Sequence, residues 1–151
     1  MIRRYGTLAA LVLGACTAGG IPTSSGGSGG VTIDVSLTQF GQPTQTPYGS
    51  SLGYRPPLTT VSVGTQLHFV NVDTFAHTAT VIFGATSFPS GSPFNAGALT
   101  QTGTSLSAKW SSGAIQPNGS SQTITADQPG TYLYGCFFHY GGGMRAAIVA
   151  Q

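Results

Sequence analysis

A short segment near the C-terminal end, residues 135–144 with the sequence GCFFHYGGGM, gathers side chains that are rare in this chain. It holds one of the two cysteines, one of the three histidines and one of the two methionines. His139 follows Cys136 by three residues, which a tight turn brings to the same point in space. Three glycines then let the chain bend back without a steric penalty, so that Met144 approaches that point as well. A thiolate, an imidazole and a thioether therefore converge.

This set of donor atoms predicts a metal site of a particular kind. Sulfur ligands together with imidazole select copper over magnesium, calcium or manganese. Structural zinc is usually closed by four Cys, His or carboxylate ligands, and a thioether is a poor substitute for any of them. Taken singly, each residue has an ordinary alternative, since Cys136 suits a buried thiol, His139 a loop and Met144 a core position. Taken together, their spacing favours copper.

A second imidazole has to come from one of the two remaining histidines. His68 lies between Leu67 and Phe69 in an alternating pattern, so its side chain points to the face opposite these two. His77 begins a strand candidate directly after the turn NVDTFA. The alternation favours His77 as the second imidazole, with His68 as the alternative.

The segments around these residues have the pattern of short β-strands. Residues 31–37 alternate strictly between apolar and polar, and residues 61–71 do so with an interruption at Gly64. The other strand candidates are residues 77–83, 105–110, 120–126, 131–136 and 145–150. No segment shows helical periodicity over three turns. We therefore expect an all-β fold, a Greek-key β-sandwich of about seven to eight strands.

Two long segments between the strand candidates are expected to be surface loops. Residues 41–57 and 85–103 are both rich in Pro and Gly, and the chain as a whole contains 23 glycines and 9 prolines.

Two parts of the sequence together resemble the cupredoxins, small blue copper proteins such as plastocyanin and pseudoazurin. They are NVDTFAH, which ends at His77, and GTYLYGCFFHYGGGM, which ends at Met144. The shared features are the C-x2-H-x4-M spacing, the distant upstream histidine and the aromatic approach to the cysteine. The resemblance covers most of residues 31–151. It implies that His77, Cys136 and His139 form a trigonal set around one copper ion, with Met144 as axial ligand.

Two positions depart from the family pattern. Phe138 stands directly before the second histidine, where family members often have Pro. Thr78 follows His77, where they commonly have an Asn that helps to tie the two ligand loops together. The sequence alone leaves open what ties these loops here.

The resemblance implies a one-electron carrier that shuttles electrons between membrane or periplasmic redox proteins. Copper storage or delivery in the cell envelope is the alternative, although the chain has no run of His or Met residues. We do not expect an enzyme with a small-molecule substrate. Three histidines cannot supply both this site and a catalytic copper cluster, and four ligands leave no open position for a substrate.

The charge of the chain argues against nucleic acid as a partner. Only 5% of the residues are charged, and the net charge of +2 comes from Arg3 and Arg4. In the remaining chain, three basic residues balance three acidic ones. Nucleic-acid binding requires a basic surface, which this composition does not supply.

The N-terminal segment has the pattern of an export signal. Two arginines precede a short apolar stretch, which is too short for a membrane-spanning helix. The sequence LGAC, which ends at Cys16, resembles the lipobox of bacterial lipoproteins. It implies removal of residues 1–15 and acylation of Cys16, whereas cleavage at a nearby small residue is the ordinary alternative. We expect an exported cell-envelope lipoprotein that faces the periplasm or the cell exterior.

Residues 16–30 then form a Gly- and Ser-rich tether between the lipidated cysteine and a copper domain at residues 31–151. The tether would let the domain reach partners near a membrane. If Cys16 carries lipid, Cys136 has no disulfide partner and remains free to bind a metal.

Overall fold

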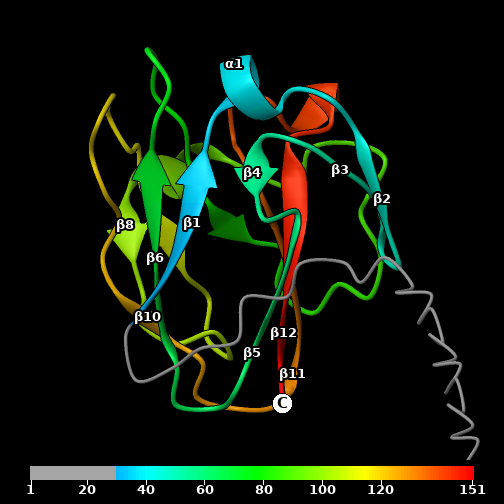
Figure 1. Cartoon of the computed structure of the whole chain (residues 1–151), viewed down its shortest axis with the longest axis vertical. Helices are drawn as coiled ribbons and strands as arrows, with labels where there is room; N and C mark the ends of the chain where they lie inside the picture. The colour runs from blue at the N-terminus through cyan, green and yellow to red at the C-terminus, as the bar shows by residue number, and fades with distance from the viewer. Residues whose placement is uncertain (1–29) are drawn as a thin grey trace, which may run out of the picture.

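The computed structural model describes residues 30–151 of the chain. Two β-sheets packed face to face form the body of this part, and a separate two-stranded sheet and long loops lie outside them (Figure 1). The predicted signal segment, Cys16 and the tether up to residue 29 lie outside this range. Among the described residues, no helix has the length and apolar character needed to cross a membrane.

The first sheet has four strands and contains the segment with the clearest alternation. In spatial order its strands are β10 (Ile124–Thr125), β6 (Gln66–Asn71), β1 (Val31–Val35) and β4 (Tyr54–Arg55). β1 and β6 run parallel, with Val31 opposite Leu67 and Val35 opposite Asn71. Every second residue of β1 is buried, as its alternating pattern predicts.

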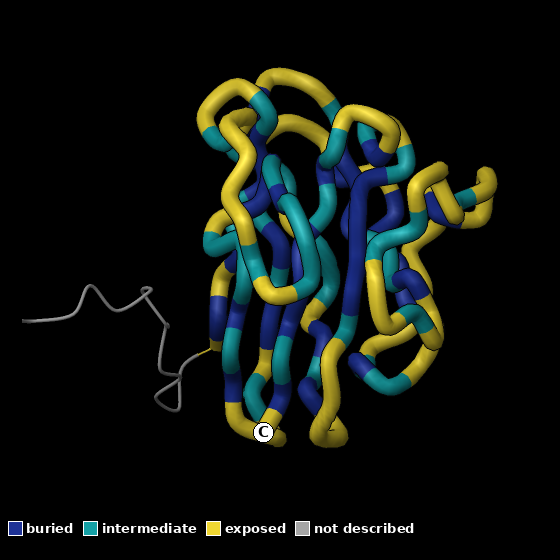
Figure 2. Tube along the Cα trace, turned by 90° about the vertical axis from the view of Figure 1, so that its right-hand side faces the viewer, coloured by how far each residue is buried: buried dark blue, intermediate teal, exposed yellow. Residues whose placement is uncertain are grey.

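The second sheet has six strands and carries the C-terminal end of the chain. In spatial order its strands are β5 (Leu58–Val61), β12 (Arg145–Ala150), β11 (Gly130–Gly135), β7 (Thr80–Val81), β9 (Ser111–Ser112) and β8 (Gln101–Thr102). β12 runs antiparallel to β11 and parallel to β5. Figure 2 shows buried residues along the strands and exposed residues mainly in the connecting loops.

The main apolar core lies between the two sheets. Four large aromatic side chains form its centre, namely Tyr54, Phe69, Trp110 and Tyr134. Phe69 stacks on Trp110 with ring centroids 5.7 Å apart, and Tyr134 meets Tyr54 edge to face at 4.8 Å. Such contacts add stability beyond the burial of area alone.

A second apolar cluster covers the outer face of the six-stranded sheet. Its buried members are Ile82, Leu133, Tyr140 and Ala147. Partly buried side chains from the two long loop segments pack on it, among them Tyr48 and Phe88. These segments also contain a hairpin of β2 (Thr44–Thr46) and β3 (Gly49–Ser51) and the 3-10 turn η1 (Ala96–Leu99). The two long segments therefore shield a sheet face. The prediction of a surface loop is wrong for residues 54–55, because they form β4 and the side chain of Tyr54 lies in the main core.

The expected all-β sandwich is confirmed, with differences in detail. Residues 30–151 contain twelve strands instead of seven or eight, because many strands of two or three residues were not recognisable in the sequence. Residues 105–110 form a turn instead of the expected strand. The interruption predicted at Gly64 is present, since this residue lies between β5 and β6 with a φ of +91°.

One end of the sandwich carries two short helical turns. The one-turn helix α1 (Leu37–Phe40) follows β1, and the 3-10 turn η2 (Tyr140–Gly142) follows β11. Figure 1 shows both at the end opposite the C-terminus. The Ser36 side chain caps α1 by accepting a hydrogen bond from the backbone N–H of Gln39 at 3.0 Å.

Candidate metal centre

Strand pairing brings the predicted ligand loops together at this end of the sandwich. β11 pairs with β7 through Gly135 and Thr80, so the chain after β11 begins beside the chain before β7. Gly135 also faces Arg145 of β12. The backbone N–H of Cys136 donates to the carbonyl of Met144 at 3.0 Å, which closes the loop between these residues.

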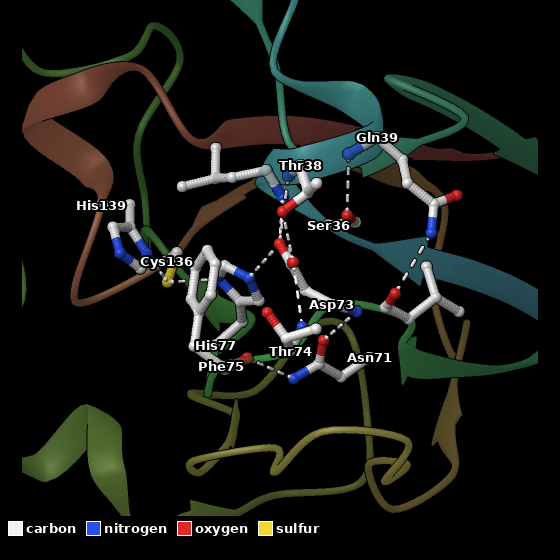
Figure 3. A network of polar contacts seen from close by, with 12 residues as sticks. Ser36, Thr38, Gln39, Asn71, Asp73, Thr74, Phe75, His77, Cys136 and His139 are labelled. Carbon is white, nitrogen blue, oxygen red and sulfur yellow. Dashed lines mark hydrogen bonds and ion pairs between the residues drawn. The ribbon is translucent and has the colours of Figure 1, made fainter.

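Three of the four predicted ligands present donor atoms to one small volume (Figure 3). One ligand atom each from His77, Cys136 and His139 lie within 4.8 Å of one another. The Cys136 Sγ is 3.8 Å from Nδ1 of His77 and 3.6 Å from Nδ1 of His139. The set therefore offers two imidazole nitrogens and one sulfur from nearby positions.

Met144 is fully buried in the same apolar cluster as Cys136. Its side chain packs on the backbone of Gly53, which has a φ of +78°. A Cβ atom at Gly53 would lie 2.6 Å from Cγ and 3.2 Å from Sδ of Met144. Because Gly53 has no side chain, the thioether of Met144 can occupy this space. The role of Met144 as the fourth ligand stays a prediction.

His68, the alternative imidazole, lies on the other face of β6. Its side chain is half-buried, and its Nε2 is 3.0 Å from the hydroxyl of Thr32 on β1. His68 is not part of the cluster formed by His77, Cys136 and His139.

The candidate centre is closed to solvent except on the side of His139. His77 and Cys136 are completely buried, whereas His139 is half-buried. Two exposed aromatic rings flank it, with centroids 5.6 Å away for Phe75 and 6.1 Å away for Phe138. The surface around the partly exposed imidazole is therefore apolar.

Asp73, which no motif in the sequence indicated as a site residue, lies behind His77. Its Oδ2 is 3.1 Å from Nε2 of His77, on the side of the ring away from Cys136 (Figure 3). Burial by itself would raise the pKa of Asp73, but hydrogen bonds from Thr38, Thr74 and His77 outweigh it and hold the pKa far below its usual range. The carboxylate is therefore charged at any pH near neutrality.

Burial shifts the pKa values of the three predicted ligand side chains toward their neutral forms. Burial lowers the pKa of His77, and the hydrogen bond to Asp73 only partly offsets this effect. Burial also lowers the pKa of His139, and the electrostatic effect of the nearby His77 lowers it further. Burial raises the pKa of the Cys136 thiol, although backbone N–H groups oppose it. Both imidazoles are thus neutral and free to bind a metal, and binding would displace the thiol proton.

Thr78 ties the two ligand loops together. Its backbone N–H donates to the Cys136 Sγ at 3.4 Å, and its hydroxyl accepts from the backbone N–H of Phe137 at 2.8 Å. Its carbonyl accepts from the buried hydroxyl of Tyr54 at 2.5 Å. Thr78 thus connects the two predicted ligand loops, although family members commonly have an Asn at this position.

The donor set fits copper. A thiolate with two imidazoles suits a soft or borderline ion, and hard ions such as magnesium or calcium prefer oxygen ligands. Asp73 contacts the far nitrogen of His77 and does not belong to the converging donor set. Within residues 30–151 Cys136 forms no disulfide, and its sulfur faces the two imidazoles.

Comparison with known proteins agrees with this assignment. The family described as copper binding proteins, plastocyanin/azurin family, matches residues 43–151. No curated protein sequence matches the chain. A reduced Cu(I) form of an amicyanin mutant superimposes with a TM-score of 0.51 at 17% identity, over 82% of this chain and 83% of that chain. A purple cupredoxin from Nitrosopumilus maritimus gives a TM-score of 0.51 at 16% identity, over 80% of this chain and 99% of that chain.

The structural likenesses show the shared fold, and the family match extends over both predicted ligand loops. Because of this family match and the cluster of His77, Cys136 and His139, the chain belongs to the plastocyanin/azurin family of copper-binding proteins, and copper is its cofactor.

Proposed function

We propose that this protein is a one-electron carrier with a mononuclear type 1 copper site, in which His77, Cys136 and His139 are the main ligands and Met144 the axial ligand. The observation that carries the proposal is the convergence of two Nδ1 atoms and one Sγ atom in a largely buried pocket. A copper ion bound by such a set supplies one-electron chemistry, since both Cu(I) and Cu(II) are accessible to it.

The residues around the ligands serve to hold them still. Asp73 accepts a hydrogen bond from His77, and Thr78 donates one to the Cys136 sulfur. The Thr78 hydroxyl also fastens the loop that contains Cys136. Ligands that keep the same positions in both oxidation states need little rearrangement when an electron is exchanged, and this favours fast transfer.

The surface around His139 suits brief contact with redox proteins. Phe75 is 40% exposed and Phe138 is 46% exposed, so two aromatic rings border the least buried predicted ligand. Gly141 and Gly142 are exposed beside them and add no side chains. With no net charge outside the first few residues, docking should be apolar and only mildly sensitive to salt.

Addition of Cu(II) to the metal-free protein tests the proposal. A thiolate ligand in a type 1 site gives an intense blue colour, so we expect this colour with the wild type and its loss with Cys136→Ser. His68→Gln is the matched histidine control and should keep the colour. A colourless Cu(II) complex of the wild type would refute the type 1 site.

Copper exchange separates electron transfer from storage or delivery. Delivery requires a site that gives up its metal readily, whereas two of the predicted ligands are completely buried. We therefore expect slow loss of Cu(I) to a chelator, and rapid loss would favour delivery. A carrier needs no substrate position at the metal, so we expect no turnover of a small molecule.

We also propose that the protein is exported and anchored through a lipid on Cys16, with residues 16–30 as a tether. The support is the N-terminal sequence MIRRYGTLAALVLGAC. Membrane fractionation of producing cells tests this proposal. The wild type should sediment with membranes and Cys16→Ser should not. Equal distribution of the two proteins would refute the anchor.

A further inference from the structure

We propose that Asp73 is a positioning residue that selects the nitrogen His77 presents to copper and lowers the reduction potential of the site. The part that concerns the potential rests on the proposed electron-carrier function. Asp73 is only 4% exposed, and it comes from the turn that also supplies His77, four residues later.

The carboxylate of Asp73 is surrounded by hydrogen-bond donors. Its Oδ2 accepts from the backbone N–H groups of Leu37 at 2.8 Å and Thr38 at 3.1 Å. Its Oδ1 accepts from the Thr38 hydroxyl at 2.6 Å and from the backbone N–H of Thr74 at 3.0 Å. These contacts fix the carboxylate between α1 and the His77 turn, so it cannot rotate away from the imidazole (Figure 3).

This arrangement determines the tautomer of His77. Both oxygens of Asp73 already accept hydrogen bonds from N–H and O–H groups, so the side chain also faces His77 as an acceptor. The Nε2 atom 3.1 Å away therefore has to carry the hydrogen. Nδ1 then keeps its lone pair and faces Cys136. The ligand nitrogen is therefore chosen before any metal arrives, as in other sites where a carboxylate orients a ligand histidine.

The charge of Asp73 also acts on the metal. In the described part of the chain its only ion-pair contact is with His77, and no Lys or Arg side chain neutralises it. A buried negative charge behind a ligand makes the imidazole a stronger donor and stabilises Cu(II) more than Cu(I). The reduction potential should therefore be lower than it would be without the carboxylate.

Replacement of Asp73 by Asn in the copper-loaded protein tests this effect. Loss of a partner of a ligand histidine typically weakens metal binding about 10- to 100-fold. If the preference for Cu(II) over Cu(I) falls about tenfold, the potential rises by about 59 mV. The control is Asp127→Asn, which removes an equal charge from an exposed carboxylate held by Ser107. Equal shifts of the reduction potential in Asp73→Asn and Asp127→Asn would overturn the proposal.

A second variant separates the charge of Asp73 from simple loosening of the turn. Thr38→Val removes the hydroxyl donor but keeps the carboxylate, which then interacts more strongly with His77. Its potential should move slightly downward, opposite to Asp73→Asn. If the reduction potential rises in both variants, Asp73 has a purely structural role, and the proposal is overturned. If Asp73→Asn does not fold, the sign of the Thr38→Val shift decides.

The tautomer can be tested without copper, by nitrogen-15 NMR of the metal-free wild type. His77 should carry its hydrogen on Nε2, with a slowly exchanging signal that the carboxylate shifts downfield. Asp73→Asn should move this signal upfield. A hydrogen on Nδ1 in the wild type would overturn the assignment. Failure of the blue colour would instead refute the electron-carrier proposal and leave the tautomer result standing.

Discussion

The Thr78 hydroxyl accepts a hydrogen bond from the backbone N–H of Phe137 at 2.8 Å, so the residue after His77 is fastened to the residue after Cys136. The Thr78 N–H adds a contact to the Cys136 sulfur at 3.4 Å. One short polar side chain thus spans two loops that lie 59 residues apart in the sequence. Its branched shape and its hydroxyl make separate contributions, which substitutions can distinguish.

Thr78→Val keeps the shape but leaves the Phe137 N–H without its acceptor. Because this donor is partly buried, the free energy of unfolding of the metal-free protein should fall by about 1–3 kcal/mol. Urea denaturation measures the change. Thr78→Ser retains the hydroxyl and should lose less than the Val variant. Equal losses for Val and Ser would show that the hydrogen bond contributes nothing.

Gly53 and Gly84 form a matched pair for testing the place of Met144. Both have positive φ values, +78° and +73°, but a Cβ at Gly53 would lie 2.6 Å from Met144, whereas nothing lies within 4 Å at Gly84. Gly84→Ala should cost only backbone strain, about 1–2 kcal/mol. Gly53→Ala should cost about 1–3 kcal/mol more through overpacking. It should also alter the copper absorption spectrum by displacing the thioether.

Urea denaturation and visible spectra of the copper-loaded variants measure these two effects. Similar stabilities for the two alanine variants would show that Met144 moves aside without cost. An unchanged spectrum for Gly53→Ala would count against Met144 as an axial ligand.

The sequence predicted those features that depend on local spacing. Alternation in residues 31–35 matches the burial along β1, and the same rule places His68 away from the candidate centre. The three-residue spacing of Cys136 and His139 predicted two donor atoms close together, which lie 3.6 Å apart. These predictions succeeded because the period of a strand and the reach of a tight turn follow from backbone geometry.

The features that the sequence did not reveal depend on contacts between distant segments. Thr38 donates to Asp73 across 35 positions, and no pattern in a single sequence pairs these residues. In addition, an Asp in a turn commonly stabilises that turn by hydrogen bonds to its backbone, so its position near a histidine does not by itself indicate a role at a metal site. Strands of two residues, such as β8 and β9, have no recognisable period because their neighbours alone make them strands.

The stability of the metal-free protein should fall in two steps as the pH decreases. His77 and His139 have pKa values below the ordinary 6.5, so the unfolded chain binds more protons and stability declines as the pH falls below about 6.5. Asp73 has a pKa below the ordinary 3.8, so its contribution is complete above that pH and is lost below it. Urea denaturation at a series of pH values measures both steps.

Two variants assign these steps to their groups. His139→Gln should reduce the dependence between about pH 6.5 and 5 while leaving the acid step. Asp73→Asn should reduce the acid step without abolishing it, because Ser107 also lowers the pKa of Asp127. A stability that stays constant between pH 7 and 5 would contradict the lowered histidine pKa values.

Electron self-exchange between copies of the copper-loaded protein tests the apolar surface at His139 without any knowledge of the natural partner. Phe138→Ser removes a ring that is 46% exposed beside His139. Phe83→Ser removes a ring that is 58% exposed in the turn after β7, where it contacts Lys109. Loss of the Phe138 ring from each copy should make the binding free energy between two copies less favourable by about 1.4 kcal/mol in total. The rate of self-exchange should then fall about tenfold. NMR line broadening in mixtures of Cu(I) and Cu(II) protein measures this rate. Phe83→Ser should leave it unchanged, and equal slowing by both variants would rule out the His139 surface as the site of contact.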